Sequence, residues 1–160
     1  MLRRTLVFAL FLATLRSNLG TAACNITGGK LYGDCSGVQI NKSTRGRLNV
    51  KSQVIESGII QGATVYDGGA LTLTGISNGE IIVHKGGTLR VSGVVNGAVI
   101  NRGGNVEIEG TVNTFETSGG RSVIGGVVGD VAGRGPVTYK KGAVIGGVPT
   151  QRTIRNSDAR

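Results

Sequence analysis

The sequence predicts an all-β fold, a single-stranded triangular β-helix (β-solenoid) of about six coils. Three observations predict it. Apolar side chains recur at every sixth residue, glycine pairs recur at every 16 to 18 residues, and short segments alternate apolar and polar residues. Six residues fit one side of a three-sided coil, and such repeats are typical of stacked architectures. Helices are disfavoured, because 29 of the 160 residues are glycine and each helical glycine costs up to about 1 kcal/mol.

Residues 1–23 predict a secretory signal peptide. Arg3 and Arg4 form a charged start, residues 6–15 are apolar, and small residues end at Ala23. The apolar run is too short to span a bilayer. We therefore expect a secreted or periplasmic protein of the cell envelope, with no transmembrane segment in the mature chain. Removing Arg3, Arg4 and Arg16 leaves fifteen basic and nine acidic residues, so the mature chain carries about +6.

Residues 24–41 are expected to form a small N-terminal cap, because an open β edge invites unwanted pairing. Cys24 and Cys35 are the only cysteines. In an exported chain, two cysteines near one end indicate a disulfide, which would stabilise the fold by roughly 3 kcal/mol. The alternative is lipidation of Cys24, which leaves Cys35 unpaired. Asn25 and Asn41 begin glycosylation sequons that matter only in a eukaryotic pathway.

Residues 42–147 are predicted to form the solenoid. Its inward-facing series loses one residue after Val95 and gains one after Ile124. The members are Ile59, Val65, Leu71, Ser77, Val83, Leu89, Val95, Ile100, Val106, Val112, Ser118, Ile124, Val131, Val137 and Ala143. The glycine pairs that turn the corners begin at Gly68, Gly86, Gly103 and Gly119, at spacings of 18, 17 and 16 residues.

Stacking of coils predicts columns of equivalent residues. The alternating segments place two apolar residues of each coil inside, so we expect two interior ladders. They consist of Leu71, Leu89 and Val106, and of Leu73, Val91 and Ile108. A third ladder, Asn78, Asn96 and Asn113, is expected at a corner, where side-chain amides can hydrogen-bond along the column. Arg90 and Glu107 point outward and are expected to form an exposed ion pair worth less than about 1 kcal/mol.

Residues 148–160 are expected to form a flexible basic tail. Pro136 and Pro149 interrupt strand pairing near this end, and the tail carries Arg152, Arg155 and Arg160.

The stretch 58–147 resembles the glycine-rich repeats of autotransporter adhesin passengers, most clearly in ISNGEIIVHKGGTLRVSG at 76–93. It also resembles the bactofilins, polymer-forming proteins with short valine- and glycine-rich coils. Both resemblances imply a right-handed β-helix, and neither supplies catalytic residues. The chain differs from autotransporters in having no room for a translocator, and from the mostly intracellular bactofilins in its export signal. Fold alone does not specify function.

The sequence shows no convincing catalytic or metal-binding motif. His84, the only histidine, precedes a glycine corner and is expected on an exposed strand, without the partners of a general base. A hexapeptide acyltransferase would use such a histidine but needs an acyl-CoA donor. Glu107, Glu109 and Glu116 lie close together, yet outward charges change sign between coils, as on a solvated face. We expect no cofactor and no metal.

The expected function is that of an exported, non-enzymatic binding or scaffolding protein. Its partner would be a protein or another copy of the chain, and an anionic envelope polymer is a further candidate, given the positive charge. We expect no nucleic-acid partner, because the four aromatic residues of the mature chain offer few platforms for base stacking. Two alternatives stay open: a self-assembling filament and a carbohydrate-active enzyme.

Overall fold

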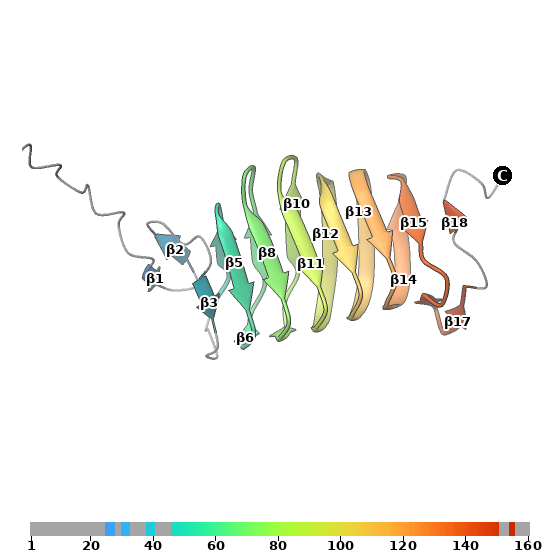
Figure 1. The fold of residues 1–160 in the computed structure, drawn as a ribbon, viewed down its shortest axis with the longest axis horizontal. Coiled ribbons are helices and arrows are strands. Elements are labelled where there is room, and N and C mark those ends of the chain that lie inside the picture. The colour runs from blue at the N-terminus through green and yellow to red at the C-terminus, as the bar shows by residue number, and fades with distance from the viewer. Residues whose placement is uncertain (1–24, 28–29, 33–37, 41–45, 151–153, 156–160) are drawn as a thin grey trace, which may run out of the picture.

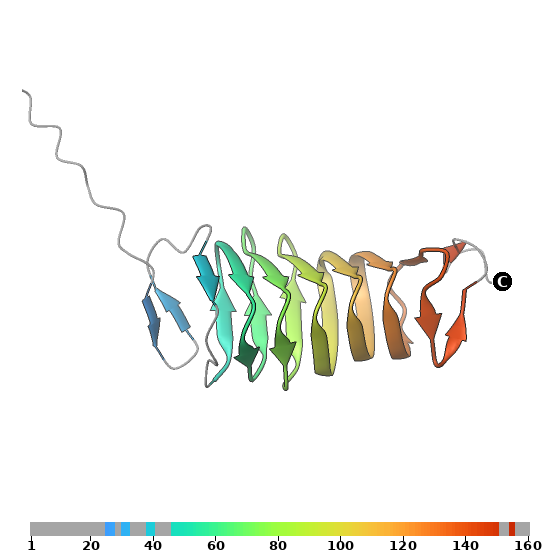
Figure 2. The same ribbon diagram turned by 60° about the horizontal axis from the view of Figure 1, so that its bottom comes forward.

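The computed structural model describes residues 25–27, 30–32, 38–40, 46–150 and 154–155. These residues form strands and connecting turns, with no helix among them, so the predicted all-β fold is confirmed (Figure 1). The chain winds into a β-solenoid of about six coils, as predicted. Figure 2 shows the coils side by side along the long axis of the molecule.

The strands are β1 (Asn25–Thr27), β2 (Lys30–Tyr32), β3 (Val38–Ile40), β4 (Leu48–Val50), β5 (Gln53–Glu56), β6 (Ile59–Ile60), β7 (Ala63–Val65), β8 (Ala70–Leu73), β9 (Ile76–Ser77), β10 (Ile81–His84), β11 (Thr88–Val91), β12 (Val94–Ile108), β13 (Thr111–Ile124), β14 (Val127–Gly133), β15 (Val137–Tyr139), β16 (Val144–Ile145), β17 (Val148–Pro149) and β18 (Ile154–Arg155).

Each coil contributes three strand segments, and each segment pairs in parallel with its counterpart in the next coil. We call the three resulting rows of strands faces A, B and C. Face A contains β4, β7, β10, the middle of β12 and β13, and the end of β14. Face B contains β3, β5, β8, β11, the ends of β12 and β13, and β15. Face C contains β6, β9, the starts of β12, β13 and β14, and β16.

The interior of face B is built from columns of apolar side chains. Leu89 pairs with Leu71 in the preceding coil and with Val106 in the next. Val91 pairs in the same way with Leu73 and Ile108. All six side chains are at most 3% exposed, so each contributes roughly 1.5–3 kcal/mol by burial.

Three residues of the expected inward-facing series point elsewhere. Ile59 is 39% exposed and Ile60 is buried in its place. Ile100 and Ser118 also lie outside the core, where the buried positions are Val99 and Asn101 in β12 and Phe115 and Thr117 in β13. The prediction was wrong at Ile100 because the six-residue spacing continues from Val95 to Asn101 and the shortening comes after it. It was wrong at Ser118 because the next coil loses a residue between Val112 and Thr114. It was wrong at Ile59 because the spacing of six runs from Val54 to Ile60. A slip of one residue turns every side chain of a strand to the opposite face.

Asn101 is tolerated in the core because its amide is fully hydrogen-bonded. The two hydrogens of its Nδ2 are shared among three acceptors, the Gly104 carbonyl (3.2 Å), the Arg121 carbonyl (3.3 Å) and Ser122 Oγ (3.0 Å). Its Oδ1 accepts a hydrogen bond from the Gly104 N–H at 2.8 Å. The buried hydroxyl of Thr117 likewise donates to the Gly119 carbonyl. These bonds remove the large cost of burying unpaired polar groups.

Glu56 occupies the same interior column as Leu73 but lacks this compensation. The residue is fully buried, and its Oε1 accepts a hydrogen bond from the Gly58 N–H at 2.6 Å. Its Oε2 is buried and has no hydrogen-bond partner among the described residues. Burial raises the pKa of the Glu56 carboxyl above its ordinary value, and the bond from Gly58 opposes that shift only in part.

Additional strands cover parts of both ends of the solenoid. At the N-terminal end, β1 and β2 form an antiparallel hairpin, β2 pairs with β4, and β3 pairs with β5. At the C-terminal end, β17 pairs antiparallel with β16, and β18 with β15. Two short strands therefore lie in the segment 148–160, which we expected to be a flexible tail. The expected signal peptide, 1–23, and both Cys24 and Cys35 lie outside the described residues.

A column of glycines marks the corner between faces B and C. A Cβ added to Gly75, Gly93 or Gly110 would lie 2.0 Å from the carbonyl oxygen of the glycine one coil earlier, closer than any real contact. The backbone of adjacent coils therefore approaches too closely at this corner for any other residue. Gly119, at the corner between faces A and B, has room for a side chain, because an added Cβ would lie 4.0 Å from its nearest neighbour, Gly103 Cα.

We expect Gly93→Ala to lower the free energy of unfolding by about 1–3 kcal/mol, because a methyl group there displaces the carbonyl of Gly75. Urea unfolding monitored by circular dichroism measures the change. Gly119→Ala is the matched control and should change stability by less than about 0.5 kcal/mol. Equal effects of the two substitutions would contradict the steric explanation.

We expect Glu56→Leu to stabilise the fold by about 1–3 kcal/mol at pH 7, because it extends the apolar column of Leu73 and removes an unpaired carboxylate oxygen. The folded state holds the Glu56 proton more tightly than the unfolded state does. The wild-type chain therefore loses stability as pH rises from about 4.5 through the raised pKa.

The gain from Glu56→Leu should thus be small at pH 4 and grow with pH, which urea unfolding between pH 4 and 8 measures. Glu116→Leu, at an exposed position of face A, is the control for loss of an acidic residue and should change stability by less than about 0.5 kcal/mol at pH 7. A constant difference between Glu56→Leu and wild type over this range would exclude titration of the buried carboxyl.

Candidate interaction surfaces

Face C carries a line of exposed apolar side chains. Ile59, Ile76, Val94, Thr111 and Val127 occupy the same outward position in five successive coils. The four apolar members are between 37% and 43% exposed. We call these five residues the apolar stripe. It runs parallel to the solenoid axis, so it presents branched apolar groups at the spacing of the coils.

An asparagine ladder lies beside the apolar stripe. Asn96 Nδ2 donates a hydrogen bond to Asn78 Oδ1 at 3.0 Å, so the structure places these two amides as the sequence predicts. Asn113 follows in the next coil, next to Val112, which pairs with Val95. No hydrogen bond joins Asn113 to Asn96 in the described part of the chain. The stripe and the ladder line an open groove formed by Val94, Asn96, Thr111, Asn113, Val127 and Gly129.

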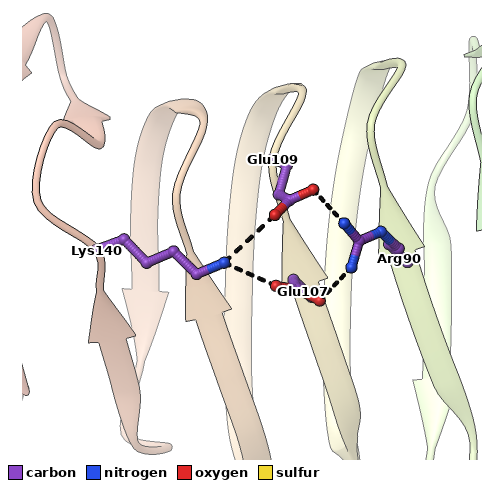
Figure 3. A network of polar contacts seen from close by, with 4 residues as sticks. All are labelled: Arg90, Glu107, Glu109 and Lys140. Carbon is purple, nitrogen blue, oxygen red and sulfur yellow. Dashed lines mark hydrogen bonds and ion pairs between the residues drawn. The ribbon is translucent and has the colours of Figure 1, made fainter.

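Face B carries a network of four charged side chains (Figure 3). Arg90 Nη1 donates to Glu107 Oε2 at 2.7 Å, as the sequence predicts, and Arg90 Nη2 also donates to Glu109. Lys140 Nζ lies 2.8 Å from Glu107 Oε1 and 3.3 Å from Glu109 Oε1. Lys140 belongs to a coil two steps from Glu107. Its side chain passes over Gly125, where a Cβ would come within 3.0 Å of Lys140 Cδ.

The four charges of the network belong to three coils and pair with one another, so the network connects coils and leaves little net charge for a ligand. The hydrogen bond from Lys140 is the main cause that lowers the pKa of Glu107, and the positive charges of Lys140, Arg90 and Arg121 add to it. The pKa of Lys140 is raised mainly by its hydrogen bond to Glu107. Because all four side chains are between about a third and a half exposed, each pair contributes less than about 1 kcal/mol.

His84 is held in an aromatic stack on face A. Its ring lies against that of Tyr66, with centroids 5.4 Å apart and planes within 9° of parallel. Lys51 Nζ lies 5.5 Å from the centre of the Tyr66 ring, and the Tyr66 hydroxyl donates to Asn49 Oδ1 at 3.3 Å. The stack thus links three coils along face A.

Two further findings concern the described residues alone. Among them, no three His, Cys, Asp or Glu side chains lie close enough together to hold a metal ion. No helix in the described segments is long and apolar enough to cross a membrane.

Sequence reasoning missed the apolar stripe, although a signal for it exists. Ile59, Ile76 and Val94 recur at spacings of 17 and 18 residues, each directly before a buried residue of face C. Two adjacent apolar residues on one short strand must point to opposite sides, so one of them is exposed. The contact of Lys140 with Glu109 has no comparable signal, since 31 residues and a whole coil separate them.

Comparisons with protein-family models, with curated proteins and with solved structures find no match for this chain. The resemblance to autotransporter passengers and bactofilins therefore extends to the β-solenoid of about six coils and no further.

Proposed function

We propose that the protein is an exported, non-enzymatic β-solenoid that binds a protein partner at the cell envelope or outside the cell. The observation that carries the proposal is the apolar stripe beside the asparagine ladder on face C. In the same proposal the solenoid is right-handed, as in the two families it resembles, and triangular in cross-section, which the three strand segments of each coil support. The proposal also includes the disulfide between Cys24 and Cys35.

The apolar stripe has the length and chemistry of a protein-binding surface. Its five residues span four coil-to-coil steps, or about 19 Å at the usual ~4.8 Å between paired strands. Contiguous exposed apolar groups mark interaction sites, and covering them contributes roughly 25 cal/mol per Å² of apolar area. The amides of Asn78, Asn96 and Asn113 offer donors and acceptors along the rim of that surface, as polar rims of interfaces do.

The other polar groups of the solenoid support a structural assignment over a catalytic one. Glu107 and Glu109 each contact both Arg90 and Lys140, so their charges are neutralised within the fold. His84 is stacked on Tyr66. These contacts stabilise the alignment of coils, which is what a scaffold requires.

The strands at the C-terminal end favour a discrete binding protein over a filament. The edges of faces B and C are already paired with β18 and β17. End-to-end stacking of copies would need those edges free to hydrogen-bond with another chain. Sedimentation velocity should therefore give a single species that does not grow with protein concentration.

The stripe is tested by capturing partners from envelope extracts on the immobilised protein. We expect Ile76→Glu combined with Val94→Glu to lower capture about tenfold or more, because two buried charges at an interface are strongly unfavourable. Thr88→Glu, at an exposed position of face B, is the control and should leave capture unchanged. Unchanged capture by the double variant would exclude face C as the binding surface.

Export is tested separately by mass spectrometry of the protein made in its own cells. We expect a mature chain that begins at Cys24 and gains two mass units upon reduction, as one disulfide requires. A chain that retains residues 1–23, or a lipid-modified Cys24, would contradict this part of the proposal.

A further inference from the structure

The corner between faces A and B gathers cations that are scattered in the sequence. Lys51, Lys85, Arg102, Arg121 and Arg134 each lie at or next to this corner, in five of the six coils. All five are exposed. The remaining coil has Asp67 at this place. We call the five cations the basic edge. At ~4.8 Å per coil, the basic edge is about 24 Å long and parallel to the solenoid axis.

The basic edge is not neutralised by the fold. Within residues 46–150, the ion pairs join Arg47 to Glu80, and Arg90 and Lys140 to Glu107 and Glu109. None of the five cations of the basic edge forms an ion pair with a described residue. The ammonium group of Lys51 lies over the Tyr66 ring. Arg121 is the smallest of the causes that lower the pKa of Glu107.

Glycine leaves the basic edge open to a large ligand. The corner of each middle coil contains a glycine pair, so few other side chains cover the backbone between the cations. Beside Gly68 there is open space, and a Cβ on Gly119 would meet nothing closer than 4.0 Å. Asp67 interrupts the basic edge after Lys51, but Lys85, Arg102, Arg121 and Arg134 follow one another in four successive coils. Such a row of like charges repels itself and concentrates counterions, which a ligand with many negative charges can displace.

We propose that the basic edge binds a linear anionic polysaccharide laid along the solenoid axis. This inference rests on the proposed function, because such a polymer is met outside the cell or in its envelope. Guanidinium and ammonium groups at successive coils suit carboxylates or sulfates repeated along a chain. Neutral sugar would need aromatic platforms, and the ring at this corner, Tyr66, is half-buried and already stacked on His84.

Two other polyanions fit the basic edge less well. Single-stranded nucleic acid binds through base stacking as well as charge, and the stack of Tyr66 on His84 leaves no second aromatic platform along the edge. A membrane surface is bound most firmly when apolar side chains enter it together with the charges. Apart from Tyr66 and Pro136, the corner consists of glycine and polar residues, and the apolar stripe lies on a different face.

The test measures binding of polygalacturonate, which carries one carboxylate per sugar, by the full mature chain. The edge variant combines Lys85→Gln, Arg102→Gln and Arg134→Gln. The matched control combines Lys141→Gln, Arg152→Gln and Arg160→Gln, which removes the same charge from outside the basic edge and leaves the ion pairs of face B intact. We expect the edge variant to raise Kd about tenfold or more and the control to raise it less than about threefold. In a plot of log Kd against log salt concentration, the slope should be smaller by roughly three in the edge variant than in the wild type, because three cationic contacts are lost.

Neutral dextran, a thymidine oligonucleotide and phosphatidylglycerol vesicles complete the experiment. Binding of polygalacturonate in preference to all three supports the proposal. Failure of the wild type to bind it, equal losses in both variants, or tighter binding of the oligonucleotide or vesicles overturns it. Urea unfolding verifies that both variants fold. Capture of protein partners by the apolar stripe of face C is measured on the same edge variant and should be unchanged. Loss of polysaccharide binding can therefore be told apart from failure of the proposed function.

Discussion

Parallel pairing between successive coils is the constraint on which the rest of this structure depends. Each coil donates and accepts backbone hydrogen bonds on three faces at once, so it cannot slide against the next coil without losing all of them. Equivalent residues are therefore held about 4.8 Å apart in straight columns. The column of Leu71, Leu89 and Val106 shows the result, since the core is a set of such columns and not a packing of separate layers.

The same constraint explains which residues the interior accepts. A column admits a polar residue only where the neighbouring backbone can satisfy it. Asn101 meets this condition because the corner after it is short and brings the Gly104 backbone within reach. Glu56 lies in the first coil, where its Oε1 reaches the Gly58 N–H and its Oε2 reaches nothing among the described residues. Two buried polar side chains thus have opposite energetic consequences in one fold.

Columns also organise the outside of the molecule. The apolar stripe of face C, the charged network of face B and the basic edge are three parallel lines, each assembled from residues of several coils. The network uses its charges internally, since Arg90 and Lys140 neutralise Glu107 and Glu109. The stripe and the basic edge stay exposed on different sides, so the two proposed partners would not compete for one surface.

The sequence by itself determined the all-β class, the number of coils and the register of the interior columns on face B, because glycine and alternating residues recur at nearly constant spacing. It did not determine which residues of the shorter coils face inward. Two corners there each lose a residue, one after Asn101 and one between Val112 and Thr114, and the positions of these losses decide which side chains of the adjoining strands face inward. Only the tertiary structure placed Lys140 over Gly125 against Glu109, and gathered cations into the basic edge. Such contacts join residues of different coils, and their geometry depends on how many residues each corner takes.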